Sequence, residues 1–273
     1  MAFWLNHINL YRMLIKVGVR NKPDRESAAR MAELIAKNPE LTINGMRMRF
    51  DPLSAQDRLI YDTVFNGSGY EPGVTKLLSK LIGKGMTFVD IGSNSGYYTL
   101  LAASRLRGSG RIIAIEPQRR VYERLKANVR LNRIRNAKML NNAAYSRSTM
   151  VEIGIPQWGD AESSIDYPNA KGHERIRAIT LDSVCKRPDV IKIDVEGYEL
   201  EVFQGMHEGL KHVKHIVFEQ NMRRLLERGM DPDSVINYIK KQGFKMHDAD
   251  SGRKIDTYRD ASAIASNIHA ERG

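Results

Sequence analysis

An acidic residue and a glycine-rich turn follow an apolar segment in the first half of the chain. Phe88–Ile91 is apolar except for Asp90, and Gly92, Asn94 and Gly96 come next at alternate positions. This order is typical of a buried strand that ends in a tight turn and continues into a helix, which is how α/β proteins build nucleotide sites. The spacing D-x-G-x-N-x-G differs from the dinucleotide fingerprint, and no G-K-[S/T] follows, which excludes a P-loop.

A second segment with the pattern of a strand lies about one βαβ unit later, and a carboxylate follows it directly. Arg111–Ile115 is followed by Glu116, where an acidic side chain can accept hydrogen bonds from both hydroxyls of a ribose. The glycine-rich turn and this carboxylate together indicate a binding site for S-adenosylmethionine. The two glycines would let the backbone approach this cofactor, and the Asp and Asn of the turn would hold its amino-acid end. Asn142, after the strand pattern at 138–142, is the candidate partner of the adenine amine.

Further carboxylates follow two later strand patterns. Asp189–Asp194 is another buried-type strand, Glu196 lies two residues beyond it, and the apolar segment Lys214–Glu219 ends in an acidic residue. Acidic side chains at the carboxyl ends of buried strands are costly unless they have a role, so they mark a candidate site.

Three motifs occur in order along this part of the chain. They are T-L-D-S-V at Thr180–Val184, I-K-I-D-V-E-G-Y-E at Ile191–Glu199 and H-I-V-F-E at His215–Glu219. In this combination the chain resembles the FkbM-type family of S-adenosylmethionine-dependent methyltransferases, over about residues 69–219. The resemblance implies O-methylation of sugars or of polyketide-type hydroxyls. It also implies that Glu71, ahead of the first strand, reaches the cofactor, and that the last strand of the sheet is reversed.

Methyl transfer to a hydroxyl needs an acceptor in line with the methyl group and a means of removing its proton. A carboxylate can act as the base, or a divalent ion such as Mg²⁺ can acidify the hydroxyl. Asp194, Glu196 and Glu219 are the catalytic candidates, and they are the metal ligands if an ion is used. Nitrogen methylation of bases usually employs a proline-aromatic loop after the fourth strand. The sequence Asp194–Gly197 at that place favours an oxygen acceptor.

The elements that position these residues alternate between helix and strand from Gly73 onward, which predicts a doubly wound, Rossmann-like class I methyltransferase sheet, mostly parallel. The expected helices span 74–82, 97–105, 119–132 and 232–241. The expected strands span 87–91, 111–115, 138–142, 150–155, 175–179, 191–194, 214–219, 244–247 and 261–265.

Residues 1–66 are expected to form a small helical extension or lid ahead of the methyltransferase domain at 67–273. Apolar side chains recur at helical spacing from Trp4 to Ile15, a second helical segment spans 24–37, and 41–50 reads as a hairpin around Asn-Gly. The first helix could lie on a membrane interface, pack on its own domain or pair two subunits, and the sequence leaves these alternatives open.

Composition fits one large domain with an appendage, because 273 residues that are 42% hydrophobic can bury a sizeable core. The single Cys185 excludes an intramolecular disulfide, and because the sequence has no cysteine cluster, a structural zinc site is not expected. No apolar run approaches the ~20 residues of a membrane span, and the first residues lack signal-peptide features. We therefore expect a cytoplasmic protein, with peripheral membrane association left open.

The net charge of +11 is densest between Arg105 and Arg147. A basic surface can meet RNA, an anionic membrane or a phosphorylated glycan carrier. RNA-binding modules interleave aromatic with basic side chains, and Tyr122 is nearly alone here, which favours a small-molecule, glycan or lipid-linked acceptor. An RNA methyltransferase and a non-catalytic protein that retains the fold are the alternatives. The polar loop Gln157–His173 is expected to select the acceptor.

Overall fold

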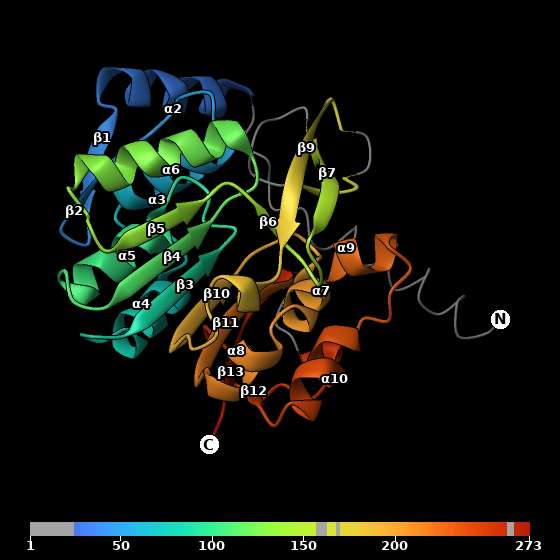
Figure 1. Cartoon of the computed structure of the whole chain (residues 1–273). Coiled ribbons are helices and arrows are strands. Elements are labelled where there is room, and N and C mark those ends of the chain that lie inside the picture. The colour runs from blue at the N-terminus through green and yellow to red at the C-terminus, as the bar shows by residue number, and fades with distance from the viewer. Residues whose placement is uncertain (1–24, 157–162, 168–169, 261–264) are drawn as a thin grey trace.

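A seven-stranded sheet in the order β12-β13-β11-β10-β3-β4-β5 forms the centre of the molecule (Figure 1). The computed structural model describes residues 25–156, 163–167, 170–260 and 265–273. The strands are β3 (Thr87–Ile91), β4 (Arg111–Ile115), β5 (Ala137–Leu140), β10 (Val190–Ile193), β11 (His215–Asn221), β12 (Lys245–Asp248) and β13 (Ala265–Glu271). Adjacent pairs among β5, β4, β3, β10 and β11 are parallel, whereas β13 runs antiparallel between β11 and β12. The predicted class I sheet with a reversed last strand is confirmed.

The central strands are buried on both faces, as their near-continuous apolar sequences require. Every residue of β10 is buried, and in β3 only Thr87 is partly exposed. Two charged side chains, Asp90 and Lys192, interrupt this apolar interior at paired positions of the neighbouring strands. The sheet therefore contains two neighbouring ionisable side chains buried at its centre.

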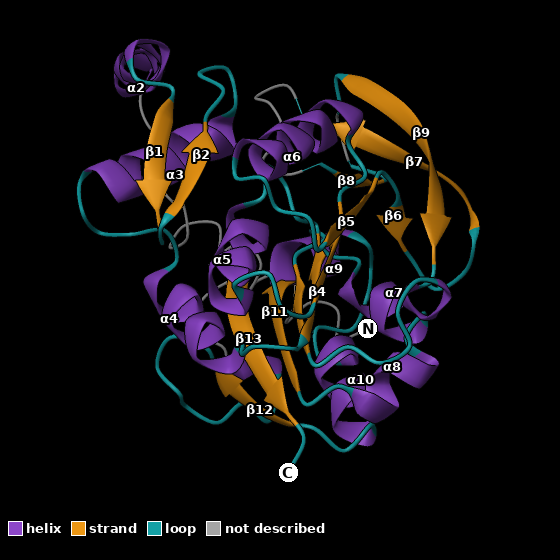
Figure 2. Cartoon of the chain, turned by 60° about the vertical axis from the view of Figure 1, so that its left-hand side comes forward, coloured by secondary structure: helices purple, strands orange, loops and turns teal. Residues whose placement is uncertain are grey.

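Helices cover both faces of the sheet (Figure 2). One face carries α4 (Pro72–Leu81), α5 (Tyr97–Leu106) and α6 (Arg119–Leu131). The other carries α7 (Glu199–Gln204), α8 (His207–His212), α9 (Met222–Glu227) and α10 (Ser234–Lys241). None of the described helices is long and apolar enough to cross a membrane.

A four-stranded sheet in the order β6-β9-β7-β8 lies beside the main one. Its strands are β6 (Ala143–Ala144), β7 (Thr149–Ile155), β8 (Ser164–Ile165) and β9 (Gly172–Ile179), and Figure 1 shows β7 and β9 extending away from the main sheet. The expected loop at 157–173 therefore contains β8 and the start of β9. Residues 157–162 and 168–169 of that loop lie outside the described residues.

The described part of the N-terminal extension packs into the core of the main α/β domain. It consists of α2 (Arg25–Lys37), the hairpin β1 (Glu40–Ile43) and β2 (Met46–Arg49), and α3 (Ala55–Phe65). The hairpin is confirmed, with positive φ at Asn44 and Gly45 as a type I′ turn needs. Ile60 and Tyr61 of α3 share one apolar cluster with Phe88 of β3. The expected helix between Trp4 and Ile15 lies outside the described residues.

Several elements differ from the sequence prediction, which did not include helices α3, α7, α8 and α9 or the two-residue strands β6 and β8. The last strand was expected at 261–265, but β13 begins at Ala265 and extends to Glu271. Its alternation of buried Ile268 and Ala270 with polar residues gives a weak apolar signal, although it is an inner strand. Helix α3 was not predicted, although Ser54 caps it by accepting a hydrogen bond from the Asp57 amide over 3.0 Å.

Replacement of Phe203 by Ala tests the core between α7 and β11. Phe203 is fully buried, and its ring meets that of Phe218 edge-on at 5.3 Å. We expect Phe203→Ala to lower the free energy of unfolding by about 3–5 kcal/mol in urea denaturation. The control Met150→Ala removes a side chain that is 53% exposed, and it should change stability by less than about 0.5 kcal/mol. Equal effects of the two variants would contradict this packing.

Candidate active site

The turn between β3 and α5 lies directly against the end of β10. A Cβ at Gly92 would stand 1.8 Å from the carbonyl oxygen of Asp194, and one at Gly96 would stand 2.8 Å from the Leu125 side chain. Both glycines also have positive φ, of 76° and 102°. Packing against backbone therefore requires glycine at position 92, whereas the positive φ favours glycine at position 96. The contact at Gly92 fixes the turn against the acidic loop that follows β10.

A buried carboxylate from α3 anchors this turn. The Ser95 hydroxyl donates to the Asp57 carboxylate over 2.6 Å, and the Asn128 amide donates to the Ser95 carbonyl over 2.9 Å. The Arg124 guanidinium lies 3.7 Å from the other Asp57 oxygen. Sequence reasoning missed Asp57, although its position three residues after Ser54 is a helix-capping signal.

Glu116 and Asn94 are brought together as the sequence predicted. The Glu116 carboxylate accepts hydrogen bonds from the amides of Asn94 and Gln118, each over 2.9 Å, and it is buried. The carboxylate that was expected to bind a ribose is thus fixed beside the glycine turn. The side chain of Asn94 accepts from the Ser95 amide over 2.7 Å.

Asn142, the candidate partner of the adenine amine, makes its side-chain hydrogen bond to β9 and not to the loop that carries Glu116. The Asn142 side chain donates to the Arg177 carbonyl of β9 over 2.9 Å. Its neighbour Asn141 donates instead to the carbonyls of Glu116, over 3.0 Å, and Pro117, over 2.7 Å. The structure therefore brings Asn141, and not Asn142, against the loop that carries Glu116.

A buried lysine stands at the centre of the carboxylates. Lys192 of β10 is 1% exposed, and its Nζ lies 3.6 Å from an Asp194 oxygen and 5.6 Å from the centroid of the Tyr98 ring. Burial alone would lower the pKa of this ammonium, but nearby carboxylates outweigh burial and raise it. These carboxylates are those of Asp194, Glu71, Glu219 and Asp90. Sequence reasoning did not assign Lys192 a role.

Asp90 is tied into the sheet rather than exposed at its edge. Burial raises the pKa of Asp90 to about 6, against the opposing effects of a hydrogen bond from Thr99 and the charge of Lys192. The Thr99 hydroxyl donates to the Asp90 carboxylate over 2.6 Å. The Thr99 hydrogen bond therefore occupies part of the accepting capacity of this carboxylate, and its contact with the cofactor's amino-acid end stays a prediction.

Glu71 joins the cluster from the N-terminus of α4, with a left-handed φ of 40°. The Tyr98 hydroxyl donates to its carboxylate. Burial raises the pKa of both Tyr98 and Tyr70 well above 10, and the Glu71 charge adds to that effect, so both phenols remain hydrogen-bond donors. The structure thus places Glu71 beside Tyr98 and close to Lys192, while its contact with the cofactor stays a prediction.

The remaining candidates occupy the ends of β10 and β11. The Glu196 carboxylate accepts a hydrogen bond from the Asn221 side chain over 2.8 Å, and Glu219 lies two residues before Asn221 on β11. Among the described residues, three metal-binding side chains with ligand atoms within 4.8 Å of one another occur at the opposite end of the sheet, not here. Asp194, Glu196 and Glu219 therefore do not form a ready-made Mg²⁺ site.

Neighbouring helices hold the acidic loop in place. Arg228 of α9's C-terminus donates to the Gly197 carbonyl and the Glu201 carboxylate, and its guanidinium lies 3.6 Å from the centroid of the Tyr198 ring. The Gly197 amide donates to the buried Glu199 carboxylate over 2.9 Å. The loop that carries Glu196 is thus fixed on both sides.

A hollow of about 390 Å³ lies between the hairpin and α4, lined in part by Asn44, Tyr70, Thr75 and Tyr97. None of the carboxylates described above lines it. The hollow is therefore distinct from the chemical site at the strand ends.

The turn residues fit S-adenosylmethionine. The Ser93 hydroxyl is buried and has no hydrogen-bond partner in the described part of the chain, so it is left for a ligand. Glu116 offers a carboxylate to a ribose, while Asp90 and Asn94 offer oxygens to an amino-acid group.

The family model described as "Methyltransferase FkbM domain" matches residues 90–246, more than half of the chain. The chain belongs to the FkbM family of methyltransferases. It is accordingly an S-adenosylmethionine-dependent methyltransferase. The hexuronic acid methyltransferase AglP of Haloferax volcanii is 25% identical over 176 residues, which cover 63% of this chain and 68% of that protein.

Solved structures of methyltransferases also resemble this FkbM-family protein. A putative rRNA methylase from Clostridium thermocellum has a TM-score of 0.47 and 12% identity, covering 73% of this chain and 95% of that one. An S-adenosylmethionine-dependent O-methyltransferase from Thermotoga maritima has a TM-score of 0.46 and 12% identity, covering 78% and 71%. At this level the likenesses carry no inference about the acceptor.

Replacement of Glu116 by Gln tests the cofactor contact. The amide keeps the shape of the side chain but loses the negative charge that faces two backbone amides and the expected ribose. We expect the affinity for S-adenosylhomocysteine to fall on the order of tenfold or more in titration calorimetry. The control Glu123→Gln alters an exposed carboxylate of α6 that pairs with Lys126, and it should bind as the wild type does. Unchanged affinity of Glu116→Gln would remove this residue from the site.

Replacement of Glu199 by Gln tests the pH dependence of stability. Burial raises the pKa of Glu199 from 4.5 to about 7, so the stability that its proton supplies is complete below the unfolded-state pKa and is lost as the pH rises through about 7. The Gln amide mimics the protonated form. From about pH 5 to pH 8, the free energy of unfolding of the variant should therefore gain about 2–3 kcal/mol relative to wild type. Urea denaturation at both pH values measures this, and parallel pH curves would contradict it.

Proposed function

We propose that this methyltransferase transfers a methyl group from S-adenosylmethionine to an oxygen atom of a sugar in a glycan or glycolipid, and that the sugar is acidic. The observation that carries this proposal is the group of carboxylates around Lys192 at the ends of β3, β10 and β11. Carboxylates beside a methyl-donor turn suit an acceptor whose proton must be removed. The loop Asp194–Gly197 offers no aromatic ring on which a base could stack.

The bound cofactor supplies an electrophilic methyl group, which leaves sulfur as the acceptor oxygen forms its new bond. We assign removal of the acceptor's proton to Asp194, because it follows β10 directly and its backbone meets the glycine turn. Glu196 and Glu219 would bind neighbouring hydroxyls of the sugar. The buried Lys192 ammonium lies 3.6 Å from an Asp194 oxygen, and this ion pair holds the carboxylate at the end of β10.

An acidic acceptor is supported by two observations. The relative AglP is named for its action on hexuronic acid. In this chain, the basic side chains between Arg105 and Arg147 are exposed except for Arg124 and Lys126. A positively charged surface raises the local concentration of an anionic substrate and speeds its encounter with the site.

RNA is the second candidate acceptor, because the same exposed arginines could contact phosphates. The described basic surface offers little stacking, since Tyr122 is half-buried beneath the Lys126 ammonium at 4.9 Å. Methyl incorporation from labelled S-adenosylmethionine into total RNA, compared with hexuronic-acid oligosaccharides, separates the two candidates. Incorporation into RNA alone would overturn the glycan proposal.

Replacement of Asp194 by Asn tests the base. We expect kcat for methylation of a hexuronic-acid oligosaccharide to fall by about 10²-fold or more, as general-base removal typically gives. Calorimetry with S-adenosylhomocysteine should give an affinity within about threefold of wild type, because the amide preserves the side chain's shape. The exposed Asp62→Asn on α3 is the matched control and should keep full activity. Retained kcat in Asp194→Asn would transfer the role to Glu196 or Glu219.

A further inference from the structure

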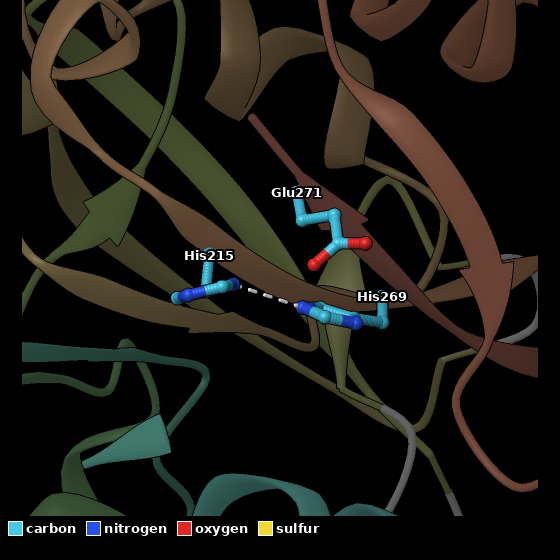
Figure 3. Close-up of side chains that lie close together, drawn as sticks. All are labelled: His215, His269 and Glu271. Atoms are coloured by element: carbon cyan, nitrogen blue, oxygen red, sulfur yellow. Dashed lines mark hydrogen bonds between the residues drawn. The ribbon is translucent and has the colours of Figure 1, made fainter. Parts of the chain in front are cut away.

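Two histidines and a glutamate meet on β11 and β13, at the end of the sheet opposite to the active site. His215 opens β11, whereas His269 and Glu271 lie near the end of β13. His215 pairs directly with Glu271 across the two strands, and His269 is two residues away on the same face. Figure 3 shows the Glu271 carboxylate turned toward the two rings.

The distances suit a shared metal ion. Nδ1 of His215 lies 3.2 Å from Nε2 of His269, and the ligand atoms of all three side chains lie within 4.8 Å of one another. Tetrahedral zinc with Zn–N bonds of about 2.0–2.1 Å holds its ligand atoms ~3.3–3.4 Å apart. The two ring nitrogens are thus already near this separation, and a rotation of the Glu271 side chain would bring its oxygen to it.

A further imidazole lies near this group on the third strand, although it is not within 4.8 Å of all three ligand atoms. His247 of β12 pairs with His269 across β12 and β13, and its Nδ1 lies 3.8 Å from a Glu271 oxygen. Two or three imidazoles with one carboxylate form a donor set that zinc prefers. The Glu271 side chain is 40% exposed, so an ion can enter from solvent.

We propose that His215, His269 and Glu271, with His247 as the fourth ligand, form a structural zinc site that fastens the reversed strand β13 between β11 and β12. Zinc would replace the proton that the two rings share in the metal-free state. Because the ligands come from three strands of the C-terminal part of the sheet, the ion would add a cross-link to strands that are held at this end by backbone pairing and by the His215–His269 contact. The site does not depend on the proposed acceptor, since it lies away from the strand ends that carry Asp194 and Glu219.

The test uses the full chain, freed of any affinity tag and of metal, and titrated with Zn²⁺ alone. We expect one zinc per chain by calorimetry and by elemental analysis, together with a rise in Tm on zinc addition. Cobalt(II) in the same site should give the visible absorption of a four-coordinate ion. Loss of zinc should leave the affinity for S-adenosylhomocysteine unchanged, which separates this site from the cofactor site.

Two variants and a control complete the test. His269→Ala removes a buried ligand, and Glu271→Gln removes a half-exposed charge with little risk to folding. Each should weaken zinc binding at least tenfold and abolish the Tm rise. His207→Ala, which alters an exposed histidine on α8, should bind zinc as wild type does. Two results would overturn the proposal: no zinc binding by the wild type, or the same zinc affinity in Glu271→Gln as in His207→Ala. The two rings would then be joined by a hydrogen bond only.

Discussion

The arrangement of the candidate active site depends on the attraction between the buried Lys192 ammonium and the carboxylates around it. A charge buried in the middle of a parallel sheet costs several kcal/mol unless opposite charges surround it closely. Here the compensating carboxylates come from β3, from the N-terminus of α4 and from the ends of β10 and β11. The lysine therefore holds those carboxylates together at the strand ends, and the base proposed here, Asp194, is also its ion-pair partner.

The cofactor turn and the acidic loop constrain each other. Gly92 leaves room for the Asp194 carbonyl, so a displacement of either segment would move the other. Asp57 holds the turn from α3, an element of the N-terminal extension, while Arg228 holds the loop from the far side. Segments distant in sequence thus preorganise one site, and the extension takes part in it through its hydrogen bond to Ser95.

Sequence alone predicted the elements whose signal is local. Continuous apolar strands, the glycine turn and the Asn-Gly hairpin are readable because burial on two faces or a positive φ dictates their residues. β13 was misplaced because its residues alternate between apolar and polar, and α3 was missed because its short apolar face gave no clear period. The sequence resemblance identified the family, and the family model confirmed it.

The candidate site residues also divide into those that local sequence signals located and those that they did not. Glu116, Asn94 and Glu71 could be located because strand ends and motif position place them. Lys192 and Asp57 could not, since a charged residue in a strand or helix reads as exposed until its partners from distant segments are known. The placement of Asn141 against the Glu116 loop depends on where β5 ends, and a shift by one residue exchanges the side chains that face it.

A crystal structure of the protein with S-adenosylhomocysteine tests the central claim most directly, by locating the cofactor's sulfur relative to the carboxylates around Lys192. The account predicts the ribose on Glu116, the amino-acid group at the turn of Asp90 and Asn94, and the sulfur facing the loop that begins at Asp194. A cofactor bound elsewhere, or one whose sulfur faces away from this loop, would contradict the account.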